Sequence, residues 1–223
     1  KMASDIDKST FDRYWQLFAN PMLVNPTNQI SLELKTLDSP LNWQEVFGND
    51  RLVEIEVGSG KGRFLKESAQ RNPDINYVGI ERASKYFEKS CERLAKHNIT
   101  TARLVYCDAP YFLYRCVADQ SVSAFHIYFP DPWPKKRHRK RRIFHNSIWI
   151  SELVRTLNNK LGVIYIATDY KTYFWEIREL FDCHPSFEYH PDKSTETNYI
   201  QTSFEIKYRK QGLPIYRAVY AKS

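Results

Sequence analysis

From residue 52 onward, short apolar runs alternate with segments in which apolar residues recur at helical spacing. The apolar runs predict five buried strands, at residues 52–57, 76–80, 102–107, 122–129 and 162–167. Helical spacing between and after them predicts helices at residues 63–71, 84–97, 143–157 and 170–181. Alternation of strands and helices on this scale is typical of a parallel, doubly wound sheet.

The end of the chain shows a different pattern. Residues 203–208 and 215–220 read as two further strands around Gly212-Leu213-Pro214, and so as an antiparallel pair. The expected fold is therefore α/β, with a doubly wound, mostly parallel seven-stranded sheet and an antiparallel C-terminal strand pair. A chain of 223 residues can bury a core of this size in one domain.

The first fifty residues lack this regularity. Two Asn-Pro steps between residues 20 and 28 indicate loop, and residues 11–18 form an aromatic-rich stretch that could be a short docking helix. We expect residues 1–50 to be an irregular extension and residues 51–223 to be the working domain.

Positive charge is concentrated in one place. The net charge is +7, and residues 135–142 alone carry seven Lys or Arg in eight positions. A local excess of this kind favours a docking patch for phosphates, although a solvated loop or a localisation signal has the same composition. Directly before it, prolines at 130, 132 and 134 restrict the backbone around Asp131 and Trp133. A rigid carboxylate beside a polycationic loop tips the interpretation toward a site for nucleic acid.

Several classes of protein fit the chain poorly. The four cysteines have no Cys-x-x-Cys spacing and the histidines are scattered, so we expect reduced thiols, a cytoplasmic protein and no metal site. Because no stretch approaches eighteen uninterrupted apolar residues, we expect no membrane association.

Glycines cluster directly after the first predicted strand. Three of the seven glycines fall at alternate positions in Glu56-Val-Gly58-Ser-Gly60-Lys-Gly62. Such clustering indicates close approach of the backbone to a ligand, or a tight turn without one. A dinucleotide loop would need glycine where Arg63 stands, and Glu56 would repel a pyrophosphate.

Acidic residues follow the ends of all five parallel strands: Glu56, Glu81, Asp108, Asp131 and Asp169. Ligands of such sheets bind beyond these carboxyl ends. A cationic cofactor without phosphate suits the site, and S-adenosylmethionine has an amino group and a sulfonium that carboxylates can face. We expect Glu81 to accept from its ribose diol and Asp108 to reach its adenine amino group.

Several motifs in order resemble the tRNA (guanine-N7-)-methyltransferases, which are class I methyltransferases. They are Glu56-Val-Gly58-Ser-Gly60, Glu81, Cys107-Asp108-Ala109, Phe129-Pro-Asp131-Pro-Trp-Pro-Lys135-Lys-Arg-His138, Thr168-Asp169 and Thr202-Ser-Phe204-Glu205. The resemblance covers roughly residues 52–220, and the Pro-Asp-Pro-Trp-Pro-Lys-Lys-Arg-His string is its most specific part. It implies a Rossmann-like S-adenosylmethionine-dependent domain over 51–223, a guanine in the tRNA variable loop as acceptor, and a monomer or homodimer.

The resemblance also assigns residues to roles. Those implied to face the cofactor are Glu56, Gly58, Gly60, Glu81, Asp108, Ala109 and Asp131. Those implied to face the substrate guanine are Lys135, Asp169, Thr202, Ser203, Phe204 and Glu205. Those implied to grip tRNA are Arg137, His138, Arg139, Lys140, Arg141 and Arg142.

Guanine N7 has a free lone pair, so its methylation needs no base and can rest on placing N7 in line with the methyl group. We expect Asp131 to accept from the N1–H or N2–H of guanine and to offset the charge that develops on the ring. Simpler roles stay open, since Glu205 could be a cross-strand partner of Lys207 or Arg209, and Asp169 could cap the following helix. Two other functions also stay open: an exocyclic-amine RNA methyltransferase, and a non-catalytic RNA-binding protein.

Overall fold

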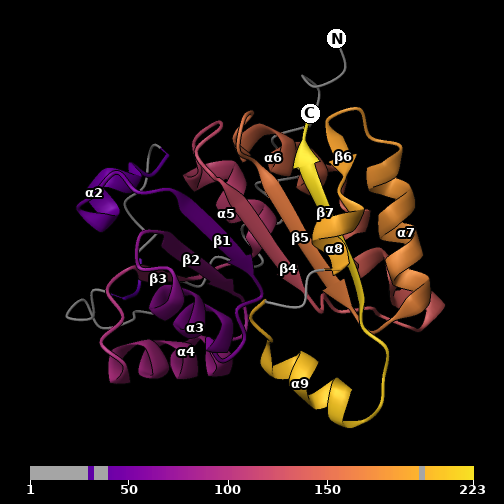
Figure 1. Cartoon of the computed structure of the whole chain (residues 1–223), viewed down its shortest axis with the longest axis horizontal. Helices are drawn as coiled ribbons and strands as arrows, with labels where there is room; N and C mark the ends of the chain where they lie inside the picture. Colours follow the sequence, from indigo (N-terminus) through magenta and orange to yellow (C-terminus); the bar gives the residue numbers. More distant parts are fainter. Residues whose placement is uncertain (1–29, 33–39, 196–198) are drawn as a thin grey trace.

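The computed structural model describes residues 30–32, 40–195 and 199–223 (Figure 1). The hypothesis of a docking helix at residues 11–18 lies outside these ranges. The chain forms a seven-stranded sheet in the order β3-β2-β1-β4-β5-β7-β6. Its strands are β1 (Val53–Val57), β2 (Asn76–Glu81), β3 (Ala102–Tyr106), β4 (Ala124–Tyr128), β5 (Val163–Thr168), β6 (Phe187–Tyr189) and β7 (Tyr216–Lys222). Strands β1 to β5 are parallel, and β7 runs antiparallel to both β5 and β6. The predicted fold class is confirmed.

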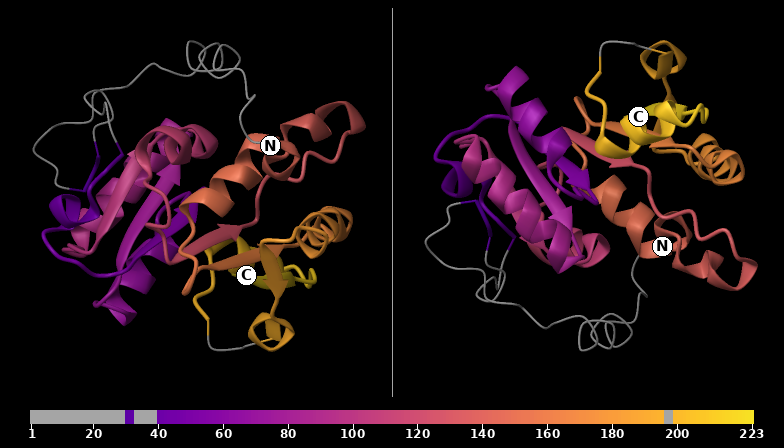
Figure 2. Two further views of the ribbon diagram at one scale, coloured as in Figure 1. Left: turned by 90° about the horizontal axis from the view of Figure 1, so that it is seen from above. Right: turned by 90° about the horizontal axis from the view of Figure 1, so that it is seen from below.

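Helices cover both faces of the sheet (Figures 1 and 2). The helices α3 (Arg63–Arg71) and α4 (Ser84–Lys96) enclose one apolar cluster with the side chains of Tyr77 and Leu104. The apolar cluster on the opposite face of the sheet is larger. It includes Ile55, Val78 and Ile127 together with residues of three further helices. These helices are α5 (Ala109–Cys116), α6 (Ser147–Thr156) and α7 (Lys171–Asp182). Because side chains alternate along a strand, neighbours such as Tyr77 and Val78 enter opposite clusters.

Burial on the helices follows the spacing that predicted them. The buried positions of α7 are Tyr173, Phe174, Ile177 and Phe181, which form one stripe along the helix. The predicted bounds of α3 match those observed. The predicted helix at 143–157 is instead a short 3-10 turn, η2 (Ile143–His145), followed by α6. Asn146 separates them, because its side chain accepts from the N–H of Ile148 and caps α6.

The C-terminal strand prediction was wrong in one element. Residues 203–208 lie in a helix, α9 (Ser203–Lys210), rather than in a strand. Thr202 caps this helix, since its Oγ1 accepts from the N–H of Glu205 at 3.1 Å. Alternation of Phe204, Ile206 and Tyr208 imitates a strand, whereas the capping sequence and the basic last turn favour a helix. The antiparallel partners of β7 are therefore β5 and the short β6.

Short elements complete the described chain. Residues 30–32 pair with the outer edge of β3, since the N–H of Leu32 donates to Leu104 O and the N–H of Leu104 donates to Ile30 O. Near them, α2 (Trp43–Phe47) is tied to the loop before β4 by a bond from Trp43 Nε1 to Ser121 Oγ. The remaining elements are η1 (Lys136–Arg141) and α8 (Pro191–Thr195).

Candidate active site

The five strand-end carboxylates share one edge of the sheet. Because β1 to β5 are parallel neighbours, their carboxyl ends point the same way, and the loops that follow them meet there. Figure 1 shows α9 lying across this edge, beyond the ends of β4 and β5. The juxtaposition that the sequence predicted is therefore present.

The glycine loop takes a backbone course that favours glycine. Gly58, Gly60 and Gly62 all have positive φ, at +76°, +55° and +67°. A Cβ on Gly62 would lie 2.1 Å from Ser90 Oγ of α4, so this glycine serves the packing of the loop. A Cβ on Gly58 would meet nothing within 4 Å. The loop is therefore packed at its end and open at its start, which suits the approach of a ligand near Gly58.

Glu56 is a buried carboxylate without a partner. Only 4% of its surface is exposed, and its Oε2 has no hydrogen-bond partner among the described residues. Burial, and then the nearby charge of Glu81, raise the pKa of Glu56 well above its ordinary value. Such a group is stabilised by a positive ligand, because the ligand favours its charged form.

Glu81 is held by the loops on either side of it. Its Oε2 accepts from the N–H of Gly60 and its Oε1 accepts from the N–H of Ala83, both at 2.8 Å. Each carboxylate oxygen can accept more than one bond, so Glu81 retains capacity for two hydroxyl donors. Its orientation is set before a ligand arrives.

Asp108 and Ala109 stand at the start of α5, where Asp108 is the capping position. Burial raises the pKa of Asp108, and the nearby Arg82 opposes that shift. The same Arg82 lies 3.6 Å from the carboxylate of Asp131. The sequence analysis missed Arg82, although its place directly after the end of β2 was a signal. Arg82 thus lies near both the start of α5 and the turn after β4.

Asp131 projects from a strained turn. Its side chain is 69% exposed, and the turn is bounded by two bulky residues with positive φ: Phe129 at +52° and Trp133 at +39°. Positive φ is uncommon for such residues and costs about 1–3 kcal/mol each, so the surrounding structure must impose it. The N–H of Phe129, which donates to Ala167 O at 2.7 Å, anchors one side. The prolines alone do not account for this conformation.

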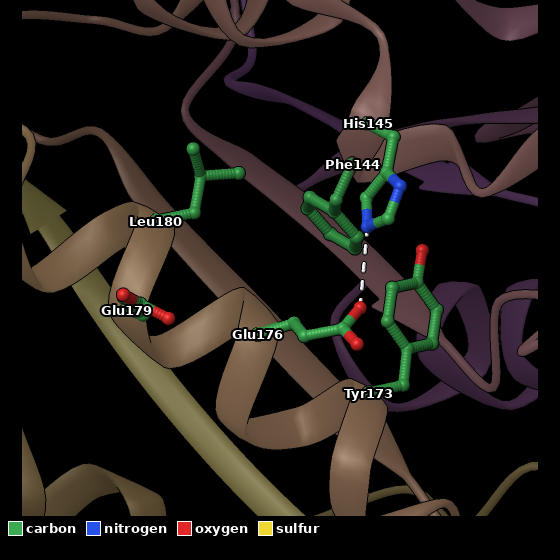
Figure 3. Close-up of a pocket in the computed structure, with 6 residues that line it drawn as sticks. All are labelled: Phe144, His145, Tyr173, Glu176, Glu179 and Leu180. Carbon is green, nitrogen blue, oxygen red and sulfur yellow. Dashed lines mark hydrogen bonds and ion pairs between the residues drawn. The ribbon is translucent and has the colours of Figure 1, made fainter. Parts of the chain in front are cut away.

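The prediction that Arg142 grips tRNA does not agree with its position. It is 1% exposed, its Nε donates to Pro132 O at 2.7 Å, and its Nη1 is bonded to Glu176. Its guanidinium also lies over the ring of Tyr173. Figure 3 shows Glu176 and Tyr173 on α7, with the Glu176 carboxylate directed to His145. Burial tends to raise the pKa of Glu176, but hydrogen bonds from Arg142 and His145 outweigh it and lower the pKa.

The rest of the basic run lies at or near the surface. Arg139 is half-buried and 3.9 Å from Glu176, and His138 packs edge-on against the Trp133 ring. The guanidinium of Arg141 also packs against Trp133, with its Cζ 5.1 Å from the centre of the ring. The exposed members are Lys135, Lys136, Arg137, Lys140 and Arg141. A cationic surface thus adjoins Asp131.

Glu205 also departs from its predicted role. It is 0% exposed and accepts from Tyr199, Arg209 and Arg217, so in this conformation it faces protein and not a substrate. Burial tends to raise the pKa of Glu205, and these hydrogen bonds outweigh it and lower the pKa. The alternative partner Arg209 does pair with Glu205, at 2.8 Å, but one turn away on α9 rather than across two strands. The second partner, Arg217, lies on β7.

The start of α9 faces the end of β4. Phe204 is 45% exposed, and its ring lies 6.4 Å from that of Phe129, while Tyr208 is 5.5 Å from Phe129. Burial and then the charges of Asp169 and Asp131 raise the pKa of Tyr208, which places both carboxylates near this helix. Ser203 is exposed and Thr202 is buried beneath it as the cap.

Asp169 does not cap α7. The capping position is Tyr170, whose N–H donates to Thr168 Oγ1 at 3.2 Å. Among the described residues, no side chain makes a capping hydrogen bond to the start of α7, and Asp169 lies half-buried directly after β5. The structure thus brings Asp131, Asp169 and the aromatic side chains of α9 into one neighbourhood.

Two kinds of feature are absent from the described part of the chain. No group of three or more His, Cys, Asp or Glu there could hold a metal ion. Within the same ranges, no helix combines the length and the apolar character needed to cross a membrane.

Comparison with known proteins identifies the relatives of this chain. Residues 50–218 match the family described as "Putative methyltransferase". A tRNA (guanine-N(7)-)-methyltransferase of Rhodopirellula baltica is 39% identical over 89% of this chain and 77% of its own length. One of Geobacter metallireducens is 31% identical over 92% of this chain and 94% of its own length.

The fold has solved counterparts as well. A structure described as a putative methyltransferase from Streptococcus mutans in complex with SAH superposes with a TM-score of 0.51 at 11% identity, over 78% of this chain and 90% of that one. At this identity the likeness concerns the fold alone. Taken with the sequence matches, these findings lead to one conclusion: this chain belongs to the tRNA (guanine-N(7)-)-methyltransferase family.

Proposed function

We propose that this chain transfers a methyl group from S-adenosylmethionine to N7 of a guanine in the variable loop of tRNA, with Asp131 as the catalytic residue. Family membership supports the reaction. One observation supports the site: an exposed carboxylate, Asp131, stands on a strained turn at the sheet edge that holds the unpartnered, buried Glu56.

The residues of the edge fit a cationic nucleoside cofactor. Glu56 has an oxygen without a partner, and Gly58 borders open space. Glu56 would hold the positive end of S-adenosylmethionine, and Glu81 its ribose hydroxyls. Asp108 and Ala109 would border its adenine, Gly58 and Gly60 would line the approach, and Asp131 would face its methyl end. When bound, S-adenosylmethionine supplies an electrophilic methyl group.

Asp131 would act on the acceptor base. Its carboxylate can accept from N1–H or N2–H of guanine, which fixes N7 and offsets the charge that the ring gains as N7 is alkylated. Before the base binds, Arg82, whose Nη2 lies 3.6 Å from Asp131 Oδ2, would restrain the Asp131 side chain. No proton has to be removed before attack, because N7 carries a lone pair at neutral pH.

Other side chains would complete the acceptor site. Phe204 and Ser203 are exposed at the start of α9, and Asp169 and Lys135 lie on the loops beside Asp131. An aromatic ring such as that of Phe204 can stack on an extruded base, and Asp169 can accept from the same donors of guanine. Thr202 contributes by capping α9. Glu205 would act by fixing α9 against β7.

The exposed basic residues would hold the tRNA backbone. Arg137, Lys140 and Arg141, with the partly exposed His138 and Arg139, form a cationic surface next to the turn. Phosphate contacts of this kind give affinity without reading sequence, so the fold of the RNA would decide which guanine reaches Asp131. The four cysteines are free thiols, which suits a cytoplasmic enzyme, and residues 51–223 would form the catalytic domain as a monomer or homodimer.

A methyl-transfer assay with labelled S-adenosylmethionine and bulk tRNA tests the proposal. Borohydride and aniline cleave RNA at 7-methylguanosine, so the product site can be mapped. We expect label in tRNA and cleavage at a variable-loop guanine. Labelled tRNA that resists cleavage would favour the exocyclic-amine reaction, and tRNA bound without label would favour a binding protein.

A further inference from the structure

The buried guanidinium of Arg142 is hydrogen-bonded to the backbone of the turn that carries Asp131. Arg142 donates from Nε to the carbonyl oxygen of Pro132, the residue directly after Asp131. The same group is bonded to Glu176 and lies 4.6 Å over the ring of Tyr173, both on α7. One side chain therefore connects the turn after β4 to a helix more than thirty residues further along the chain.

We propose that Arg142, held by Glu176, is a positioning residue for methyl transfer that maintains the conformation of the Asp131 turn. The inference rests on the proposed role of Asp131. The inference gives Arg142 a different role from the exposed members of the basic run. Arg142 is their neighbour in sequence, but it is buried and they are at the surface.

The turn around Asp131 is strained, and Arg142 is placed to restrain it. Phe129 and Trp133 hold positive φ on either side of Asp131, and such residues relax unless neighbouring contacts restrain them. Phe129 is restrained by Ala167 of β5. On the other side of Asp131, the carbonyl oxygen of Pro132 accepts from Arg142 Nε, and within the described part of the chain no backbone–backbone hydrogen bond restrains residues 131–134. Loss of that bond would free Asp131 to move relative to the cofactor edge.

Stability alone explains the arrangement poorly. Burying a guanidinium is costly, and a buried ion pair often contributes no more than an apolar replacement of similar volume. Here the Nη2 of Arg142 has no hydrogen-bond partner among the described residues, which adds to the cost. Arginine is nevertheless suited to the geometry, because its planar fork donates to two acceptors in fixed directions while its face stacks on an aromatic ring. Lysine could not make all three contacts.

The test compares Arg142→Lys and Glu176→Gln with a matched control, Arg178→Lys. Arg178 also lies on α7, pairs with Asp182 and stacks 3.7 Å over Tyr189, but it does not touch the turn. For each variant we would measure the turnover number at saturating tRNA and cofactor, the tRNA dissociation constant at two salt concentrations, and the melting temperature.

We expect Arg142→Lys to lower the turnover number by about 100-fold, since a displacement of about 1 Å can cost this much. Glu176→Gln should lower it by about tenfold, because Arg142 keeps its bond to Pro132. Affinity for tRNA and its salt dependence should stay unchanged in both, and Arg178→Lys should lower only the melting temperature. Weaker tRNA binding with a smaller salt slope and normal turnover would instead assign Arg142 to RNA contact. Turnover equal to that of the parent in both Arg142→Lys and Glu176→Gln would reduce the cluster to a structural role.

A double variant separates this inference from the proposal on which it rests. If Arg142 acts through Asp131, Arg142→Lys should cost little further turnover in an Asp131→Asn background, and an undiminished cost there would overturn the inference. If Asp131→Asn by itself keeps normal turnover, the proposed role of Asp131 fails. In that case, the effect of Arg142→Lys on the parent enzyme still reports whether Arg142 supports catalysis by another route.

Discussion

Two buried glutamates show how differently the halves of the sheet edge are built. Glu56, on the cofactor side at β1, has an oxygen without a partner, and its pKa is raised. Glu205, on the acceptor side in α9, accepts from three side chains, and its pKa is lowered. The same residue type at similar burial is in one place a carboxyl group that lacks a hydrogen-bond partner and favours its neutral form, and in the other an ion-paired carboxylate that anchors a helix. A buried carboxylate that the protein leaves unpaired is the better candidate for a ligand contact.

On the proposed acceptor side, the buried cations are likewise paired within the protein. Arg142 and Arg217 are bonded to Glu176 and Glu205, and they hold backbone elements in place. The groups left for chemistry are exposed: Asp131, Phe204 and the basic side chains of η1. Under the proposed function, the cofactor half would offer buried carboxyl groups to a small molecule, whereas the acceptor half would offer exposed charges to a large one.

The sharpest test of this division is Asp131→Ala. An exposed carboxylate adds little to folding, so the melting temperature should hardly change. Loss of an electrostatic contact to the transition state should lower kcat/KM by about 10³-fold, or about 4 kcal/mol. Methyl-transfer kinetics and tRNA binding would be measured side by side. A comparable loss of tRNA affinity would move Asp131 from the catalytic to the binding residues.

Glu205→Gln should affect stability before activity. It weakens two bonds from arginines and leaves Arg217, a largely buried cation, without its anion, which should cost about 3 kcal/mol of unfolding free energy. Denaturant unfolding measures this loss. Ser203→Ala, at an exposed position of the same helix, serves as the stability control. Normal stability combined with lost turnover would restore Glu205 to the guanine contacts that its sequence position implied.

Glu56→Gln should weaken the binding of S-adenosylmethionine by about 10–100-fold, the worth of one charged hydrogen bond. Calorimetry of cofactor binding would measure the change. Glu88→Gln, an exposed site on α4, should leave binding unaltered. Unaltered binding in Glu56→Gln would remove Glu56 from the cofactor site.

Because of Glu56, we expect folding stability and cofactor affinity to change with pH in opposite directions. Folded Glu56 holds its proton at higher pH than in the unfolded chain, where its pKa is near 4.5. The stability that this proton gives is fully present below that pH and is lost as pH rises through the raised pKa. Cofactor affinity should rise over the same window, since a cation favours the ionised form. Melting curves and titrations from pH 4.5 upward should show both trends in the parent, and Glu56→Gln should weaken them, although Asp108, whose pKa burial also raises, keeps part of the trend in stability.

Removing one exposed cation should have the smallest effect. Lys140→Gln should weaken tRNA binding by a few-fold and reduce the dependence of log affinity on log salt by about 0.7–0.9. Binding at several salt concentrations would measure the slope. Lys96→Gln, at the end of α4, gives the matched surface control. An unchanged slope in Lys140→Gln would mean that this part of the basic run faces away from the RNA.

Much of the molecule follows from local patterns in its sequence. The helix at residues 63–71 and the parallel strands are specified by apolar periodicity, which depends only on how side chains alternate along each element. Parallel strand order then requires Glu56, Glu81, Asp108, Asp131 and Asp169 to share one edge, so the candidate site could be predicted without coordinates. The motif around Asp131 likewise identified the family.

Tertiary structure decided what each charged residue does there. Arg141 and Arg142 are adjacent arginines in one basic run, yet one is exposed and the other buried, because Glu176 and Tyr173 arrive from a distant helix. Residues 203–208 alternate like a strand, but they form a helix that Thr202 caps and that Arg217 of β7 anchors through Glu205. Local sequence specifies periodicity and the order of the strands, whereas burial and pairing depend on partners that only the folded chain brings within reach.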